Sequence, residues 1–169
     1  ALASLAACAP RSASFEGPTG RMIEASARAH GVPAELMAAI AHVEGGLRLA
    51  PLREVDEDEL VPVAGVLELR HGRFDSLARG AALTGLSQRE IERDLARGTD
   101  AGARVLAELG ASAGVGSAHA GDLAAWAPVV EELSGHLRAR VRVAYRARVF
   151  AVLRDGGHLR ARGGEIITV

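Results

Sequence analysis

The sequence has no lysine and no asparagine, only one cysteine and one glutamine, and few aromatic residues, which make up 3% of its 169 residues. A single cysteine excludes an internal disulfide and a cysteine-based zinc site. With so few aromatic residues, the core must be built from aliphatic and alanine side chains, and small side chains favour closely packed helices. The length is sufficient for one domain with a substantial core.

Neither sign of charge is in excess, since the formal net charge is -1. Apart from histidine, all the basic residues are arginine. Without a global basic field the chain is not expected to bind nucleic acid. No stretch is long and apolar enough for a transmembrane helix. The six histidines, at positions 30, 42, 71, 119, 136 and 158, have no spacing typical of metal ligands, so we expect no metal or cofactor in this chain.

Residues 33–46 form the stretch around which the chain is organised. Pro33 suits the first position of a helix, and Gly45 and Gly46 suit its end. Between them the apolar positions recur at helical spacing, at Leu36, Met37, Ile40 and Val43. The pattern predicts a buried helix with Glu44 in its last turn, where the helix dipole disfavours negative charge and so favours a neutral acid. Glu44 is therefore a candidate general acid, the alternative being a solvated glutamate.

The first residues carry a possible membrane anchor. The letters LAAC at residues 5–8, followed by polar residues, resemble a bacterial lipobox, in which the signal peptide is cut before the cysteine and the cysteine is acylated. We expect residues 1–8 to be the end of a lipoprotein signal peptide and Cys8 to hold the protein at a membrane. This predicts the cell envelope, at the periplasmic face of the outer membrane if the source is Gram-negative. The alternative is a chance run of small residues around a buried thiol.

The remaining chain reads as a tether and a series of helices. Residues 9–18 have no period and are expected to be a tether. Helices are expected at residues 19–30, 74–83, 87–98, from 99 or 100 to 109, 122–134 and 137–153. A capping box begins at Ser87, Thr99 or Asp100 is expected to cap the following helix, and Pro128 either kinks its helix or marks a start near Ala127.

Two further segments have less regular patterns. The acidic run at residues 56–59 lacks the glycine of a calcium loop and reads as a solvated loop. Residues 159–162 and 165–169 flank two glycines and predict a terminal β-hairpin.

Four motifs, in this order, resemble those of a known family. The letters AAIAHVE at 38–44 are similar to the small and apolar approach to an "E-S" pair, and GVLE at 65–68 is similar to "G-L-M-Q". Residues 98–106, with Gly102 kept, are similar to "N-x-x-x-G-x-x-x-L", and LSG at 133–135 to "Y-S-G". The chain thus resembles the lysozyme-like, lytic-transglycosylase-type domain, especially the one that precedes the zinc domain in some bacterial N-acetylmuramoyl-L-alanine amidases.

The resemblance implies an all-α, lysozyme-like helical domain over residues 19–155 with a C-terminal β-hairpin. Residues 156–169 would then be a hairpin or linker leading to a further domain. A fused amidase domain is a possible partner of this kind, and any zinc would belong to it. The implied partner of the present domain is the glycan strand of peptidoglycan.

The resemblance also implies the site. Glu44 would be the general acid that cleaves the bond between N-acetylmuramic acid and N-acetylglucosamine, and Glu68 is the candidate second carboxylate. The positions implied in substrate binding are Gly45, Gly65, Leu67, Leu133 and Ser134.

The chain departs from the family's pattern at several of these positions. Gly45 stands in place of the serine, Glu68 in place of the glutamine, Gly98 in place of the asparagine and Leu133 in place of the aromatic residue. Two alternatives to a glycan-cleaving enzyme therefore stay open. One is a non-catalytic peptidoglycan-binding module of a cell-wall amidase, and the other is a lipid-anchored helical interaction domain without affinity for glycan.

Overall fold

The computed structural model describes residues 13–45, 64–119, 121–161 and 164–169. These residues contain seven α-helices and one small antiparallel sheet. The α-helices are α1 (Gly17–His30), α2 (Ala34–Gly45), α3 (Ser76–Thr84), α4 (Gln88–Arg93), α5 (Leu95–Ser112), α6 (Ala127–Leu133) and α7 (Ala139–Asp155). The mostly helical class predicted from the sequence is confirmed. Cys8 and the acidic run at 56–59 lie outside the described residues.

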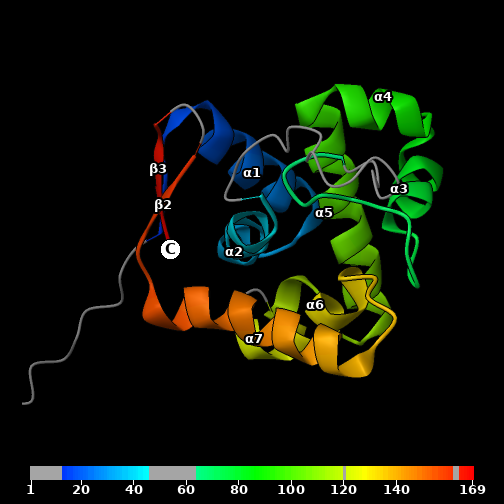
Figure 1. Ribbon diagram of the computed structural model, residues 1–169. Helices are drawn as coiled ribbons and strands as arrows, with labels where there is room; N and C mark the ends of the chain where they lie inside the picture. The colour runs from blue at the N-terminus through cyan, green and yellow to red at the C-terminus, as the bar shows by residue number, and fades with distance from the viewer. Residues whose placement is uncertain (1–12, 46–63, 120, 162–163) are drawn as a thin grey trace, which may run out of the picture.

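Helix α2 lies in the middle of the molecule, where Figure 1 shows it nearly end-on among the other helices. Residues 36–41 are all completely buried, three of them large and apolar and three of them alanine. A helix that is apolar on every side is stable only when it is covered on every side, which agrees with its contacts to α1 and α7. The helix ends at Gly45, so the predicted place of Glu44 in the last turn is confirmed.

A tight turn at residues 64–69 follows in the described chain. Ala64 and Leu69 exchange backbone hydrogen bonds of 2.9 and 2.8 Å, and the apolar side chains of the turn point into the core. Gly65, at a φ of +68°, lies directly against the backbone of Gly98 in α5: a Cβ on Gly65 would be 2.4 Å from the carbonyl carbon of Gly98. Both positions therefore require glycine, and α5 fixes where the turn lies.

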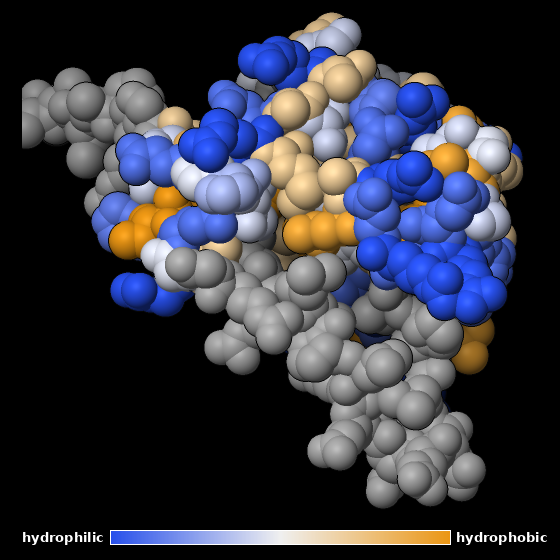
Figure 2. All heavy atoms as spheres, turned by 90° about the horizontal axis from the view of Figure 1, so that it is seen from above, coloured by the Kyte–Doolittle hydropathy of each residue, from blue (hydrophilic) through white to orange (hydrophobic). Residues whose placement is uncertain are grey.

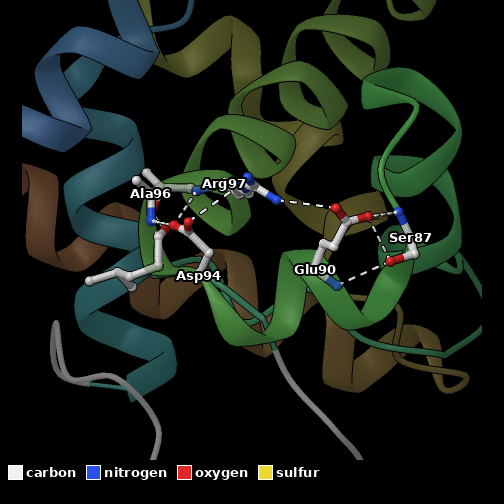
Figure 3. Close-up of polar contacts among 7 residues, drawn as sticks. Ser87, Glu90, Asp94, Ala96 and Arg97 are labelled. Carbon is white, nitrogen blue, oxygen red and sulfur yellow. Dashed lines mark hydrogen bonds and ion pairs between the residues drawn. The ribbon is translucent and has the colours of Figure 1, made fainter.

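The start of α5 differs from the prediction, whereas the capping box before it is confirmed (Figure 3). The Ser87 N–H donates to Glu90 Oε2 at 2.9 Å, and the Glu90 N–H donates to Ser87 Oγ at 3.3 Å. Asp94, rather than Thr99 or Asp100, caps α5 by accepting from the N–H groups of Ala96 and Arg97. The predicted cap was wrong because Asp94 follows directly on α4, so the next helix begins there.

We expect Asp94→Ala to lower the free energy of unfolding by about 1 kcal/mol, because two N–H groups at the start of α5 lose their acceptor. Urea unfolding followed by circular dichroism measures the change. Asp94→Asn is the matched control and should lose much less, since asparagine also caps helices. Equal losses in the two variants would mean that the charge, and not the cap, matters.

Helix α6 begins at Ala127 and has Pro128 in its first turn, so the second of the two predictions for this proline is confirmed. The residues before it form a short 3₁₀ helix, η2 (Leu123–Trp126), and another, η1, covers Ser117–His119. Trp126 is completely buried, and its ring N–H donates to the carbonyl of His119 at 3.2 Å. This contact holds the loop before α6 on the core.

The sheet joins the two ends of the described chain. Strand β3 (Ile166–Thr168) pairs antiparallel with β2 (His158–Arg160), as the hairpin prediction requires, and also with β1 (Ser14–Phe15). The strand order is β1-β3-β2, and Figure 1 shows the sheet at the opposite side of the molecule from α3 and α4. Residues 14–18, expected to be tether, are thus a strand and the start of α1, because β3 supplies a pairing edge.

The same end of the molecule supplies the cap of α1. Glu165 Oε2 accepts a hydrogen bond of 2.9 Å from the N–H of Thr19. The prediction that Thr19 itself caps the helix was wrong, since α1 begins at Gly17 with Pro18 in its first turn.

Few large apolar side chains are exposed in the described residues: Leu137, Val143 and Ile166. Figure 2 shows the face seen from above, where polar residues lie on both sides of a band of apolar ones. Among the described residues, none of the helices is both long and apolar enough to cross a membrane.

Candidate functional site

The Glu44 carboxylate lies at the end of α2, beside the segment that follows the 64–69 turn. Its side chain is only 9% exposed, and its Oε2 is ion-paired with Nη2 of Arg70. Arg70 comes directly after Leu69, which closes the turn with its hydrogen bonds to Ala64. The position of the guanidinium is therefore set by the turn, and that of the carboxylate by the buried helix.

Arg70 also contacts Glu68. Its Nε–H donates to the Glu68 carbonyl at 3.1 Å, and its Nη2 lies 3.6 Å from Glu68 Oε2. Burial alone would lower the pKa of Arg70, but the two carboxylates outweigh it and raise that pKa, so the guanidinium stays charged. One positive charge thus serves two negative ones, and the three side chains carry a formal charge of -1. We call them the Glu44–Glu68–Arg70 cluster.

Glu68 holds a strained backbone conformation. Its φ of 47° makes it the one non-glycine residue with positive φ among those the structure describes. Such conformations cost about 1 kcal/mol or more and occur preferentially at functional sites. The strain identifies the turn as a candidate site independently of any sequence motif.

Gly45 and Glu68, two of the departures from the family's pattern, lie against each other. A Cβ on Gly45 would be 2.6 Å from Oε1 of Glu68. A serine at position 45 would therefore displace the Glu68 carboxylate. The two departures are thus physically coupled, and the room left by the missing side chain is taken by the second carboxylate.

Helix α7 adds Tyr145, whose side chain is buried beside Glu44. The hydroxyl has no hydrogen-bond partner among the described residues. Burial raises the pKa of Tyr145 well above its ordinary value, and the charge of the nearby Glu44 carboxylate raises it further, although no hydrogen bond of normal geometry joins them. Tyr145 therefore stays a phenol and offers an O–H donor next to Glu44. Tyr145 was not predicted from the sequence as a residue of the site.

His136 and Arg148 enclose the other side of Tyr145. The rings of His136 and Tyr145 meet edge to face with centroids 6.1 Å apart, and the Arg148 guanidinium carbon is 5.9 Å from the centroid of the tyrosine ring. Burial lowers the pKa of His136, and the charges of Arg70 and Arg148 lower it further against the opposing effect of Glu44. His136 is therefore neutral near pH 7.

The remaining residues implied in substrate binding are packed inside the fold. Leu67, Leu133 and Ser134 are each at most 5% exposed, and the Ser134 hydroxyl donates to the carbonyl of Glu131 at 2.6 Å. Gly65 is occupied by its contact with α5. These residues shape the backbone around the cluster, and their side chains are not accessible to a ligand.

The end of α6 nevertheless lies next to the segment that carries Arg70. The Arg73 N–H donates to the Gly135 carbonyl at 2.9 Å, and a Cβ on Gly72 would be equally close to that carbonyl oxygen. Residues 133–136, the 64–73 segment and the end of α2 thus meet in one place. The structure brings these three motifs together through backbone and side-chain contacts, and the contact between Gly65 and Gly98 adds the fourth.

The cluster can act in two ways chemically. A carboxylate paired with a guanidinium is an anion, so it is a proton acceptor or an ion-pair partner until the pair opens. Once released from the pair, the carboxyl group could exchange a proton with a bound substrate. Within the described residues, no group of three or more histidine, cysteine, aspartate or glutamate side chains is arranged to hold a metal ion.

Comparison of the chain with protein-family models, with curated proteins and with solved structures gives no match.

Proposed function

We propose that this chain is a lysozyme-like domain that acts on the glycan strands of peptidoglycan, with Glu44 as the general acid at the bond between N-acetylmuramic acid and N-acetylglucosamine. The observation that carries the proposal is the mostly buried Glu44 carboxylate at the end of the central helix, beside the strained turn that holds a second carboxylate. The order of the motifs around these two glutamates supplies the substrate class.

In the proposed reaction the neutral Glu44 donates its proton to the glycosidic oxygen while the bond from that oxygen to the sugar carbon breaks. Positive charge develops on the sugar as the leaving group departs. The Glu44 carboxylate then takes a proton from water, which gives hydrolysis, or from the sugar's own hydroxyl, which gives transglycosylation. Glu68 is the candidate to stabilise the positive charge or activate the water, since Arg70 holds its carboxylate close to Glu44.

A second function, a peptidoglycan-binding module without catalysis, is favoured by one observation. Arg70 is ion-paired with Glu44, and a general acid must be protonated. If that pair stays closed with glycan bound, the domain holds the strand, and bond cleavage belongs to another domain, such as an amidase.

Glu44→Gln is expected to abolish glycan cleavage. Cleavage by the whole chain is measured by incubating it with murein sacculi and identifying the soluble fragments by mass spectrometry. New reducing ends would indicate hydrolysis, and anhydro-muramyl ends would indicate transglycosylation. We expect the variant to lose at least about a hundredfold in rate, the typical contribution of a general acid.

Glu132→Gln is the matched control, because Glu132 pairs with Arg73 and is 38% exposed. This variant should cleave like the wild type. Sacculi that are bound but left intact by all three proteins would support the binding module, and sacculi that are neither bound nor cleaved would rule out both functions.

The proposed place of action is the cell envelope, with Cys8 as a lipid anchor and a fused amidase domain as a possible partner. The lipobox-like residues 5–8 support the anchor. A domain anchored in this way would lie on the same side of the membrane as the sacculus.

A further inference from the structure

The Glu44–Glu68–Arg70 cluster is arranged so that Arg70 can change partners. Arg70 is the most exposed of the three, at 23%, against 9% for Glu44 and 14% for Glu68. Its Nε–H is held by the Glu68 carbonyl, and its Nη2 is paired with the Glu44 carboxylate, so an incoming anion competes with Glu44 for the guanidinium. Arg70 therefore offers solvent a larger fraction of its side chain than either glutamate does.

The Tyr145 hydroxyl lies beside Glu44 but makes no hydrogen bond of normal geometry with the described residues. A buried hydroxyl without a partner is costly, and this one lies beside the Glu44 carboxyl group. If Arg70 turned to another anion, the Glu44 carboxyl group could turn toward the Tyr145 hydroxyl and accept a hydrogen bond from it. The buried hydroxyl would then have a partner, and Arg70 would keep an anion beside it.

We propose that Arg70 binds a free carboxylate on the sugar next to the cleaved bond, and that this exchange of partners releases Glu44. The inference rests on the proposed function, and it names the substrate class: glycan strands whose muramic acid residues carry free lactyl carboxylates. A planar guanidinium fork fits a carboxylate better than it fits a neutral amide, since only the carboxylate forms charged hydrogen bonds.

The chemistry of muramic acid indicates which reaction must come before the action of this domain. In peptide-bearing strands the lactyl carboxyl group is bound in an amide, so it carries no charge and cannot compete with Glu44 for Arg70. Hydrolysis of that amide exposes the carboxylate. The reaction that supplies the preferred substrate is therefore an amide hydrolysis, and the domain acts after it.

The test uses the whole chain and two probes that differ only at the lactyl carboxyl group. The first probe is peptide-free glycan strands with free lactyl carboxylates, and the second is the same strands after conversion of those carboxylates to methylamides. We expect the wild type to bind the first probe about tenfold more tightly, as loss of a charged hydrogen bond predicts. The difference should shrink as salt is added.

Arg70→Gln should bind both probes equally, because the guanidinium is gone. Arg104→Gln is the control: Arg104 pairs with Asp100 on the surface of α5 and should leave the preference intact. If Arg70→Gln does not fold, the double variant Arg70→Gln/Glu44→Gln replaces it, because it has no unpaired charge at position 44. The double variant should also bind the two probes equally.

The outcomes separate the two proposals. If the wild type binds both probes equally, or if the preference survives in the Arg70 variants, the role of Arg70 is wrong while the proposed glycan function stands. If the wild type binds neither probe but binds or cleaves sacculi, the role of Arg70 is again wrong. If it binds neither the probes nor sacculi and cleaves neither, the proposed function is wrong and the role of Arg70 falls with it.

Discussion

Arg70→Gln is expected to lower the free energy of unfolding by about 3 kcal/mol or more, even in the absence of any ligand. The substitution leaves Glu44, which is 9% exposed, and Glu68, which is 14% exposed, without their shared positive charge. Removing one partner of a largely buried ion pair costs more than the pair contributes, because the remaining charge stays out of water. Urea unfolding at neutral pH measures the loss.

Adding Glu44→Gln to this variant should recover part of the lost stability, because the uncompensated charge is removed with it. A coupling energy of about 1–3 kcal/mol between the two positions is expected from the double-mutant cycle. Arg73→Gln is the matched control: its pair with Glu132 is more than a third exposed, so its loss should stay within about 1 kcal/mol. Additive effects of Arg70 and Glu44 would show that the pair does not hold the site together.

The part of the site that the sequence predicted depends on local patterns. The buried helix, its end at Gly45 and the place of Glu44 follow from periodicity and from glycine, which act within a few residues. The capping box at Ser87 is equally local. Such features are encoded by neighbouring residues and need no knowledge of the tertiary structure.

The partners of Glu44 could not be predicted in the same way. Arg70 lies 26 positions further along the chain, and Tyr145 is on α7. Nothing in the sequence next to Arg70 distinguishes it from the other arginines of the chain. The tertiary fold alone selects the one whose backbone is fixed by the turn at residues 64–69.

The errors at the helix starts have a similar cause. Asp94, Thr99 and Asp100 are all suitable caps, and the winner is decided by where α4 ends. Strand β1 has two residues and exists only because β3 offers an edge to it. Competition between equivalent local signals, and pairing between distant segments, are what a single sequence leaves open.

The backbone contact between the turn and α5 gives the second large prediction. Gly98→Ala is expected to lower the free energy of unfolding by about 3 kcal/mol or more, because a Cβ there would lie 2.6 Å from the Gly65 nitrogen and 2.9 Å from the Ile91 carbonyl oxygen. These are backbone atoms, which cannot move aside as a side chain can. The expected sign is opposite to that of helix propensity, which favours alanine over glycine by about 1 kcal/mol inside a helix.

Two other glycines make the argument for Gly98 quantitative. Gly116→Ala should change stability by less than about 1 kcal/mol, since no atom lies within 4 Å of the added methyl group. Gly102→Ala should be intermediate, because its Cβ would meet the side chain of Leu67, which can shift. A small effect at Gly98 would mean that the turn moves readily away from α5. Because that turn carries Glu68 and leads directly into Arg70, such freedom would also contradict a preorganised cluster around Glu44.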